Sequence, residues 1–172
     1  MKEYKVKKGQ FYFNPRTIGI HTGVKEKQWR VRFNESCLYD KIDAENDWNK
    51  GAGWSYGFNI HGDSVRWAWR ADKQYNAIEI CIYLYQNGIR TTSKESIYVP
   101  INQDIFIRLR ANGAFASLFT REFETGIRRS ITAPFTAKKR WGRWSGLYFG
   151  GNASAPKDIT IHMEKLQLQE YL

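Results

Sequence analysis

Six polar or aromatic side chains in the middle of the chain could form one ligand-binding surface. They are Arg66, Arg70, Glu79, Tyr83, Tyr85 and Arg108. Each alternates with apolar neighbours, which places the two kinds of side chain on opposite faces of a strand. If these strands adjoin, tyrosine rings and charges share a face suited to stacking on sugars and hydrogen bonding to hydroxyls. The alternative is an ordinary exposed face, or one covered by a protein partner.

A run of cations and indoles nearer the C-terminus is a second candidate site. It comprises Lys138, Lys139, Arg140, Trp141, Arg143 and Trp144, with Arg128 and Arg129 upstream. Interleaved cations and aromatic rings bind phosphate or sulfate chains and stack on bases or sugars. No recognised nucleic-acid-binding module accompanies the run. The alternative is that Trp141 and Trp144 anchor the core beneath a solvated basic loop.

Four acidic residues close together raise the question of a metal site. They are Asp40, Asp43, Glu45 and Asp47. Calcium requires several oxygen ligands, but this spacing lacks the glycine and the alternation of the helix-loop-helix calcium motif, which favours a solvated acidic loop. The histidines and cysteines show no zinc spacing, and no phosphate-binding loop or nucleophile elbow occurs. We therefore expect no cofactor, with calcium at this loop as the alternative.

Short strands must position these residues. Residues 54–61 and 64–71 predict a hairpin around Gly62-Asp63, and residues 77–86 predict a strand that turns at Asn87-Gly88 into 89–91. Further strands are predicted at 11–13, 16–22, 27–33, 96–99, 105–110 and 115–119. Residues 34–52 lack a strand period and predict a long loop with one helical turn, and 121–145 are the least regular part. The spacing of strands and turns predicts an all-β, antiparallel two-sheet sandwich forming one domain over 1–172.

The segment from Gly146 to Met163 predicts a short aromatic strand, a glycine corner at Gly150-Gly151, a small-residue loop and a long closing strand. Glycines at the corner permit a sharp turn or the close approach of another backbone segment. Leu166 breaks the parity of the closing strand, which predicts a bulge near Glu164-Lys165. The apolar character of this strand predicts a place in the middle of a sheet.

Composition narrows the partners and the cell compartment. The formal charge is +10, from 27 basic and 17 acidic residues, which favours polyanionic partners in general. No apolar run is long enough to span a membrane, and the N-terminal segment lacks the apolar core of a signal peptide. Cys37 and Cys81 lie in apolar contexts and are predicted to be reduced residues in strands, with one disulfide as the alternative. Synthesis in a reducing cytoplasm is expected, followed by action outside the cell if the protein is released by lysis, as virion components are.

Three short motifs carry a resemblance to known proteins. Tyr148-Phe149-Gly150-Gly151-Asn152, Ala155-Pro156 and Asp158-Ile159-Thr160-Ile161 resemble the end of a concanavalin A-like lectin/glucanase jelly roll. The stretch is more closely similar to small proteins of gut Bacteroidetes and their tailed phages. The resemblance implies a jelly-roll sandwich, but the superfamily includes lectins, glycan lyases, glycosidases and virion surface modules, so the fold alone does not fix the function.

Two kinds of catalysis known in this superfamily can be compared with the sequence. Retaining glucanases use Glu-x-Asp-x-x-Glu, whereas the Glu-x-Asp here is Glu45-Asn46-Asp47 with Lys50 in the place of the second glutamate, which excludes this chemistry. Alginate-lyase-like members carry Gln-Ile-His and Tyr-Phe-Lys motifs, which Asn59-Ile60-His61 and Tyr148-Phe149-Gly150 resemble. A lyase would use His61 and Tyr148 for proton transfer and Asn59 to neutralise the uronate. The arginine-rich strand of those lyases is absent, and Gly150 replaces their lysine.

These observations predict a non-enzymatic, lectin-like surface module. The expected protein is virion-associated, either a capsid decoration or a tail or fibre component, and it docks on a structural protein or on further copies of itself, with glycan binding as an additional role. A polysaccharide lyase acting on an acidic glycan is the first alternative. A basic, nucleic-acid-associated domain is the second.

Overall fold

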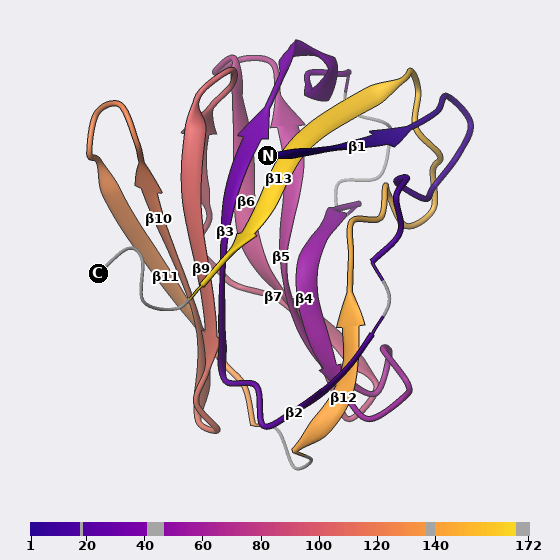
Figure 1. The fold of residues 1–172 in the computed structure, drawn as a ribbon, viewed down its shortest axis with the longest axis vertical. Helices are drawn as coiled ribbons and strands as arrows, with labels where there is room; N and C mark the ends of the chain where they lie inside the picture. Colours follow the sequence, from indigo (N-terminus) through magenta and orange to yellow (C-terminus); the bar gives the residue numbers. More distant parts are fainter. Residues whose placement is uncertain (18, 41–46, 137–139, 168–172) are drawn as a thin grey trace.

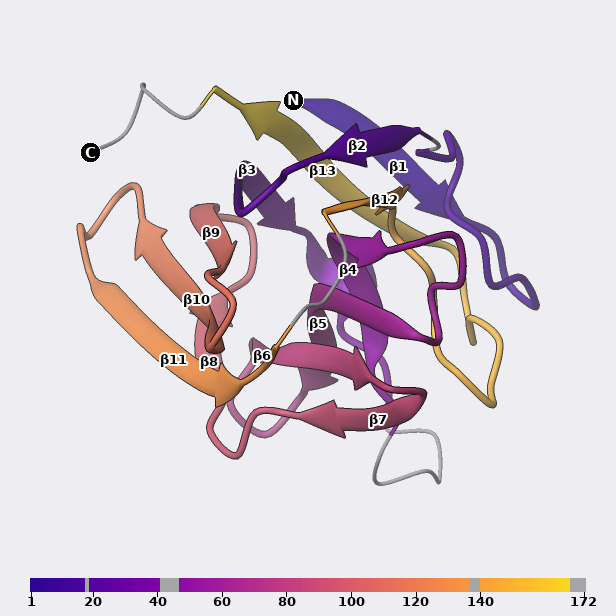
Figure 2. The same ribbon diagram turned by 90° about the horizontal axis from the view of Figure 1, so that it is seen from below.

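The computed structural model describes residues 1–17, 19–40, 47–136 and 140–167, which form two antiparallel β-sheets packed face to face (Figure 1). One sheet has six strands in the order β1-β13-β3-β9-β10-β11, and the other has seven in the order β2-β12-β4-β5-β6-β7, with β8 paired to β6. Viewed from below, β6 and β7 lie on the opposite side of the molecule from β1 and β13 (Figure 2). The predicted all-β, jelly-roll sandwich is therefore confirmed.

The six-stranded sheet contains the predicted closing strand in its interior. Its strands are β1 (Lys2–Val6), β3 (Glu26–Phe33), β9 (Asp104–Ala111), β10 (Phe115–Glu122), β11 (Arg128–Pro134) and β13 (Ile159–Leu166). β13 lies between β1 and β3, as its apolar sequence predicted. Its pairing with β3 keeps one register from Ile161–Phe33 to Leu166–Gln28. The bulge predicted near Glu164-Lys165 was therefore wrong, because Leu166 simply ends the strand.

The seven-stranded sheet contains the predicted hairpins. Its strands are β2 (Ile20–Thr22), β4 (Asn49–Tyr56), β5 (Asp63–Asp72), β6 (Ala77–Gln86), β7 (Ile89–Thr92), β8 (Ile97–Pro100) and β12 (Trp141–Ser145). β4 pairs with β5, and β6 pairs with β7 through Asn87 and Gly88, whose φ angles are 52° and 81°. Positive φ at both central residues is what a tight hairpin turn of this hand requires. This turn prediction is confirmed.

Several segments differ from their prediction. Residues 11–13 do not form a strand, and Tyr148 makes isolated bridges to Tyr12 and Lys50 in place of the predicted short strand. In the predicted loop at 34–52, the expected helical turn is present as a short 3₁₀ helix, η1 (Glu35–Cys37), but the segment also contains the start of β4. β1, β11 and β12 lie where no strand was predicted. β1 and β11 are the two edge strands of the six-stranded sheet. β11 buries only the side chains of Ile131 and Ala133. The alternation of apolar and polar residues is therefore weak in these edge strands.

Large aromatic side chains fill the space between the sheets. Trp54, Trp67 and Trp69 are fully buried there, and Phe33 packs against both Trp67 and Trp69. Both cysteines are free and buried, as predicted, although Cys37 lies in η1 and not in a strand. The described residues include no helix with the length and apolar character needed to cross a membrane.

Candidate ligand-binding site

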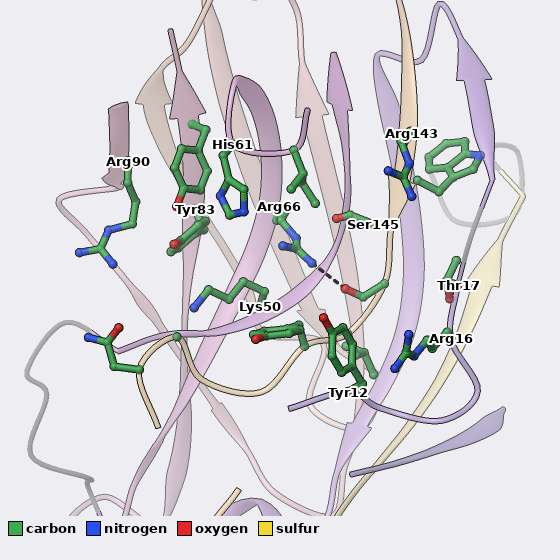
Figure 3. A pocket seen from close by; sticks show the side chains of 18 residues that line it. Tyr12, Arg16, Thr17, Lys50, His61, Arg66, Tyr83, Arg90, Arg143 and Ser145 are labelled. Atoms are coloured by element: carbon green, nitrogen blue, oxygen red, sulfur yellow. Dashed lines mark hydrogen bonds between the residues drawn. The ribbon is translucent and has the colours of Figure 1, made fainter. Parts of the chain in front are cut away.

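A pocket of about 590 Å³ lies on the outer face of the seven-stranded sheet (Figure 3). Lys50 from β4, Arg66 from β5 and Tyr83 from β6 project from adjacent strands to form its floor. His61, from the loop before β5, and Arg90 of β7 lie on one side. Residues 12, 16, 17 and 143–148 line the other side, and Gly151 and Asn152 add to the rim. A volume of ~300–1,000 Å³ is typical of small-ligand sites.

Lys50 reaches the pocket because β4 is irregular. The pairing of β4 with β5 shifts by one residue between Lys50 and Gly53, so that both residues face outward although their numbers differ by three. A Cβ atom on Gly51, within this bulge, would lie 2.0 Å from Cε3 of Trp67. Only glycine therefore allows the bulge to pack directly on the buried indole, and the bulge in turn directs Lys50 outward.

The glycine corner closes the pocket over β4. Gly150 has a φ of +60°, and its backbone N–H donates to Oδ1 of Asn49 at 2.6 Å. A Cβ atom on Gly151 would lie 2.6 Å from Oδ1 of Asp47 and 3.0 Å from Nζ of Lys50. The predicted sharp turn and close backbone approach are confirmed at Gly150, where a Cβ atom would lie 2.1 Å from the carbonyl oxygen of Ala153, whereas the atoms close to Gly151 belong to side chains.

Arg66 is the half-buried cation at the centre of the floor. Its Nη2 donates to the carbonyl oxygen of Gly146 at 2.8 Å, whereas no described residue accepts a hydrogen bond from its buried Nε. Burial lowers the pKa of Arg66 to about 10, so the guanidinium remains charged at neutral pH. One fixed hydrogen bond therefore orients a cation that still has donor capacity.

Lys50 is the second cation of the floor. Its side chain is buried, and its Nζ donates to the carbonyl oxygen of Gly150 and lies 3.7 Å from Oδ1 of Asp47. Burial lowers the pKa of Lys50 to about 8; Asp47 opposes this shift, and Arg66 and Arg90 add to it. Such a lysine is still mostly protonated at pH 7.

Aromatic rings line the remaining surface. Tyr12 and Tyr148 meet edge to face with ring centroids 5.1 Å apart, and His61 and Tyr85 do so at 4.9 Å. Burial raises the pKa of Tyr83 to about 12 and also raises the pKa of Tyr148. The phenols therefore stay protonated at neutral pH, so they offer hydroxyl donors and acceptors together with apolar ring faces.

The charge of the pocket is of one sign. Five lining residues are cationic: Arg16, Lys50, Arg66, Arg90 and Arg143. Among the described residues that line it, none is acidic. Arg90 lies at one end of the pocket and Arg16 and Arg143 lie at the other, with Lys50 and Arg66 between them (Figure 3).

The predicted sheet face is only partly one surface. Arg66, Tyr83 and Tyr85 line the pocket. Trp48 packs with Ala68, Cys81 and Tyr83 on this face, and Arg70 stacks on Trp48 at 4.3 Å and pairs with Glu79. Arg70 and Glu79 therefore lie outside the described lining of the pocket. The placement of Arg108 was wrong, because β9 belongs to the six-stranded sheet, where the guanidinium of Arg108 lies over Phe119.

The basic-aromatic run is divided in the same way. Arg143 and Trp144 line the pocket, whereas Trp141 meets Phe58 edge to face at 4.7 Å. Arg140 is exposed, and Lys138 and Lys139 lie outside the described residues. Trp144 also packs against the core, as the alternative interpretation predicted, and Lys27 and Lys165 lie over its ring.

The residues proposed for a lyase come only partly together. His61 and Tyr148 both line the pocket, but Asn59 does not; its Oδ1 accepts a hydrogen bond from the backbone N–H of His61 at 2.9 Å. Of the acidic residues considered for calcium, Asp40 pairs with Lys73 and Asp47 with Lys50. Asp43 and Glu45 lie outside the described residues, within which no cluster of three or more potential metal ligands occurs.

Sequence reasoning did not find Tyr12, Arg16, Lys50 or Arg90. Because the bulge shifts the register of β4 by one residue between Lys50 and Gly53, the alternation of the sequence does not reveal which face of the sheet Lys50 occupies. Tyr12 and Arg16 come from the N-terminal segment, which reaches the pocket through pairing of Tyr12 with Tyr148. The guanidinium of Arg16 lies 4.0 Å from the centroid of the Tyr12 ring. No local signal in residues 11–17 indicates this long-range contact.

The architecture is a two-sheet, antiparallel β-sandwich of the jelly-roll type, and solved structures share this fold. The CBM2 module of the evolved Dit of Lactobacillus casei BL23 phage J-1 matches with a TM-score of 0.59 and 9% identity, over 94% of this chain and 74% of that one. The GH43 protein BlXynB from Bacillus licheniformis matches with a TM-score of 0.52 and 10% identity, over 94% of this chain and 32% of that one. A functionally unknown protein from Saccharomyces cerevisiae matches with a TM-score of 0.51 and 11% identity, over 96% and 88%.

These similarities concern the fold alone. The chain spans about a third of the length of the xylan beta-1,4-xylosidase from Bacillus halodurans C-125 and of the GH43 protein BlXynB, 32% of each. No family model matches the sequence, and no curated protein matches it either.

Proposed function

We propose that this protein is a non-enzymatic, lectin-like module that binds glycans in the pocket between His61 and Tyr12. The observation that carries the proposal is the combination of tyrosine rings with hydrogen-bonding side chains in a pocket of about 590 Å³. Sugars present apolar ring faces together with hydroxyl groups, and such a lining complements both. The predicted surface residues Arg66, Tyr83 and Tyr85 are part of this pocket.

A virion location is the second part of this proposal. The fold similarity to a module of a phage Dit protein supports it, as does the resemblance of residues 148–161 to proteins of gut Bacteroidetes and their tailed phages. On this proposal the module docks on a structural protein or on further copies of itself and presents the pocket outward. Proteomics of intact particles from the source would detect it at a fixed, high copy number.

The glycan-binding proposal is tested with purified protein on a broad glycan array. Tyr12→Ala removes a half-exposed ring at the pocket rim and should reduce binding about tenfold, since stacking aromatic anchors contribute strongly to binding. Tyr75→Ala is the matched control, because Tyr75 is exposed in the turn between β5 and β6 and does not line the pocket. Equal loss in both variants, or no glycan retained by the parent protein, would contradict the proposal.

A polysaccharide lyase is the second candidate, because His61 and Tyr148 line the same pocket. Lyase action on uronate polymers creates an unsaturated product that absorbs ultraviolet light. A rising absorbance that disappears in Tyr148→Phe would replace the binding proposal with this one. A flat trace on several uronate polymers would exclude the lyase.

A further inference from the structure

The strongest unexplained property of the pocket is its charge. A pocket for a neutral sugar needs hydrogen-bonding groups but gains nothing from an excess of positive charge. Five cations line this pocket, and of these Lys50 lies 3.7 Å from a carboxylate oxygen of Asp47. Like charges brought together repel one another, and burial adds a desolvation cost for Lys50 and Arg66. The lowered pKa of Lys50 reflects this environment, with burial as the main cause. A ligand that carries negative charge would offset both costs.

The arrangement of the cations indicates more than one acidic group. Lys50 and Arg66 occupy the floor, whereas Arg90 and the pair Arg16 and Arg143 stand at opposite ends (Figure 3). A single carboxylate on the floor could not contact both ends. A chain that crosses the floor could place one acidic group centrally and others toward the ends, with its sugar rings against the tyrosines between them.

We propose that the ligand of this pocket is a polyanionic glycan segment that carries acidic groups on successive sugars, running from Arg90 across Arg66 toward Arg16 and Arg143. This inference rests on the proposed glycan-binding function and narrows it to a ligand class. Guanidinium groups recognise carboxylate and sulfate through paired, charge-assisted hydrogen bonds. Both acid types therefore fit, and the experiment distinguishes them.

The test is calorimetric titration with oligogalacturonides of increasing length and with the same oligomers as methyl esters. The ester removes the charge and keeps the sugar backbone, so we expect it to bind at least about tenfold more weakly, the loss expected when charge-assisted hydrogen bonds are removed. Affinity for the acid form should rise with length until the oligomer reaches both ends of the pocket. Heparin oligosaccharides serve as the sulfated ligands in the same titration. If they bind more tightly than the oligogalacturonides, sulfate is the acidic group that the pocket prefers.

Exposed arginines supply matched variants that leave the core unchanged. Arg90→Ala and Arg16→Ala should each weaken binding of the acid oligomer about threefold or more, as expected for exposed charge contacts. Arg110→Ala removes the same charge from an exposed site on β9 in the other sheet and should leave binding unchanged. A similar loss in all three variants would show that net charge alone attracts the ligand, and would overturn the inference.

The remaining outcomes separate this inference from the function on which it rests. If acid and ester bind equally and Tyr12→Ala weakens both, the pocket binds glycans without selecting for charge, so only the inference fails. If none of the acidic oligomers binds, the inference fails, and the glycan array then decides the function separately. If single-stranded DNA of similar charge binds as tightly as the best oligosaccharide, and competes with it, the ligand class is wrong.

Discussion

Lys50 is a pocket residue whose pKa lies close to physiological pH. Burial lowers its pKa to about 8, and the charged groups that act on it are Asp47, Arg66 and Arg90. An anion bound beside it would raise this pKa, because a nearby opposite charge favours the protonated amine. We therefore expect the proposed binding of an acidic glycan to be stronger at pH 7 than above pH 8, where the free protein loses this proton.

Titration at pH 7 and pH 9 tests this expectation. At pH 9, one pH unit above the pKa, about a tenth of the free protein keeps the proton on Lys50, so affinity for the oligogalacturonide should fall by up to about tenfold. Tyr83 does not titrate in this range, because its pKa is about 12. Lys50→Met should bind more weakly at pH 7 and show little change between the two pH values. An unaltered pH dependence in Lys50→Met would contradict the role given to this amine.

At the scale of single elements, the sequence predicts best where a strand is regular and two-sided. The β5 strand alternates Val65, Trp67 and Trp69 with outward residues, and the turn at Asn87-Gly88 has a specific chemical signature, so both were predicted correctly. Bulges and edge strands give no comparable signal. The bulge at Gly51 changes which β4 residues face outward, and β11 buries too little to show alternation. Two of the three floor residues, Arg66 and Tyr83, were predicted, whereas Lys50 and the N-terminal side of the pocket were not.

The β4 bulge makes a testable contribution to stability and binding. The Cβ atom of Gly51→Ala would meet three ring atoms of Trp67 at 2.0–2.5 Å, so β4 or the indole must move. We expect a loss of about 2–3 kcal/mol in the free energy of unfolding, as for other overpacked cores, and weaker oligogalacturonide binding because Lys50 is displaced. Urea unfolding followed by tryptophan fluorescence measures the first effect.

Gly126→Ala is the control for this substitution. Gly126 has a φ of +72° and open space around its Cβ position, so alanine there incurs only a backbone cost of about 1 kcal/mol. It lies between β10 and β11, away from the pocket lining. If both variants lose the same stability and keep full binding, the bulge does not position Lys50.

At the scale of the whole molecule, the two sheets differ in how they handle positive charge. Among the described residues that line the pocket on the seven-stranded sheet, five are cationic and none is acidic, although Asp47 pairs with Lys50 and Glu79 pairs with Arg70 on the same face. On the outer face of the six-stranded sheet, by contrast, the buried carboxylate of Asp104 pairs with both Arg30 and Arg32, at 2.6 Å from Nε of Arg32. The two faces point in opposite directions (Figure 2). A ligand in the pocket would therefore leave the face that carries the Asp104 ion pairs uncovered.

The pairing at Asp104 predicts how the molecule responds to acid. Burial by itself would raise the pKa of Asp104, but hydrogen bonds from Arg32 and Arg30 hold it below its usual range. Because the folded-state pKa is lowered, this carboxylate stabilises the fold at pH values above its ordinary pKa, and the stabilisation is lost as the pH falls through the folded-state pKa. Asp104→Asn should therefore reduce the free energy of unfolding by about 1–2 kcal/mol at pH 7, since both arginines are partly exposed.

Urea unfolding of the parent and of Asp104→Asn at pH 7 and at pH 3 measures this contribution. The difference between the two proteins should shrink at pH 3, because this pH lies below the ordinary pKa of an aspartate and the unfolded chain then binds a proton that the folded carboxylate resists. Glu95→Gln changes the net charge equally at an exposed residue and should alter stability little at either pH. With a net charge of +10, loss of any carboxylate adds some general repulsion, which this control measures. A difference that is the same at both pH values would mean that packing around Asp104, and not its charge, supports this face of the sandwich.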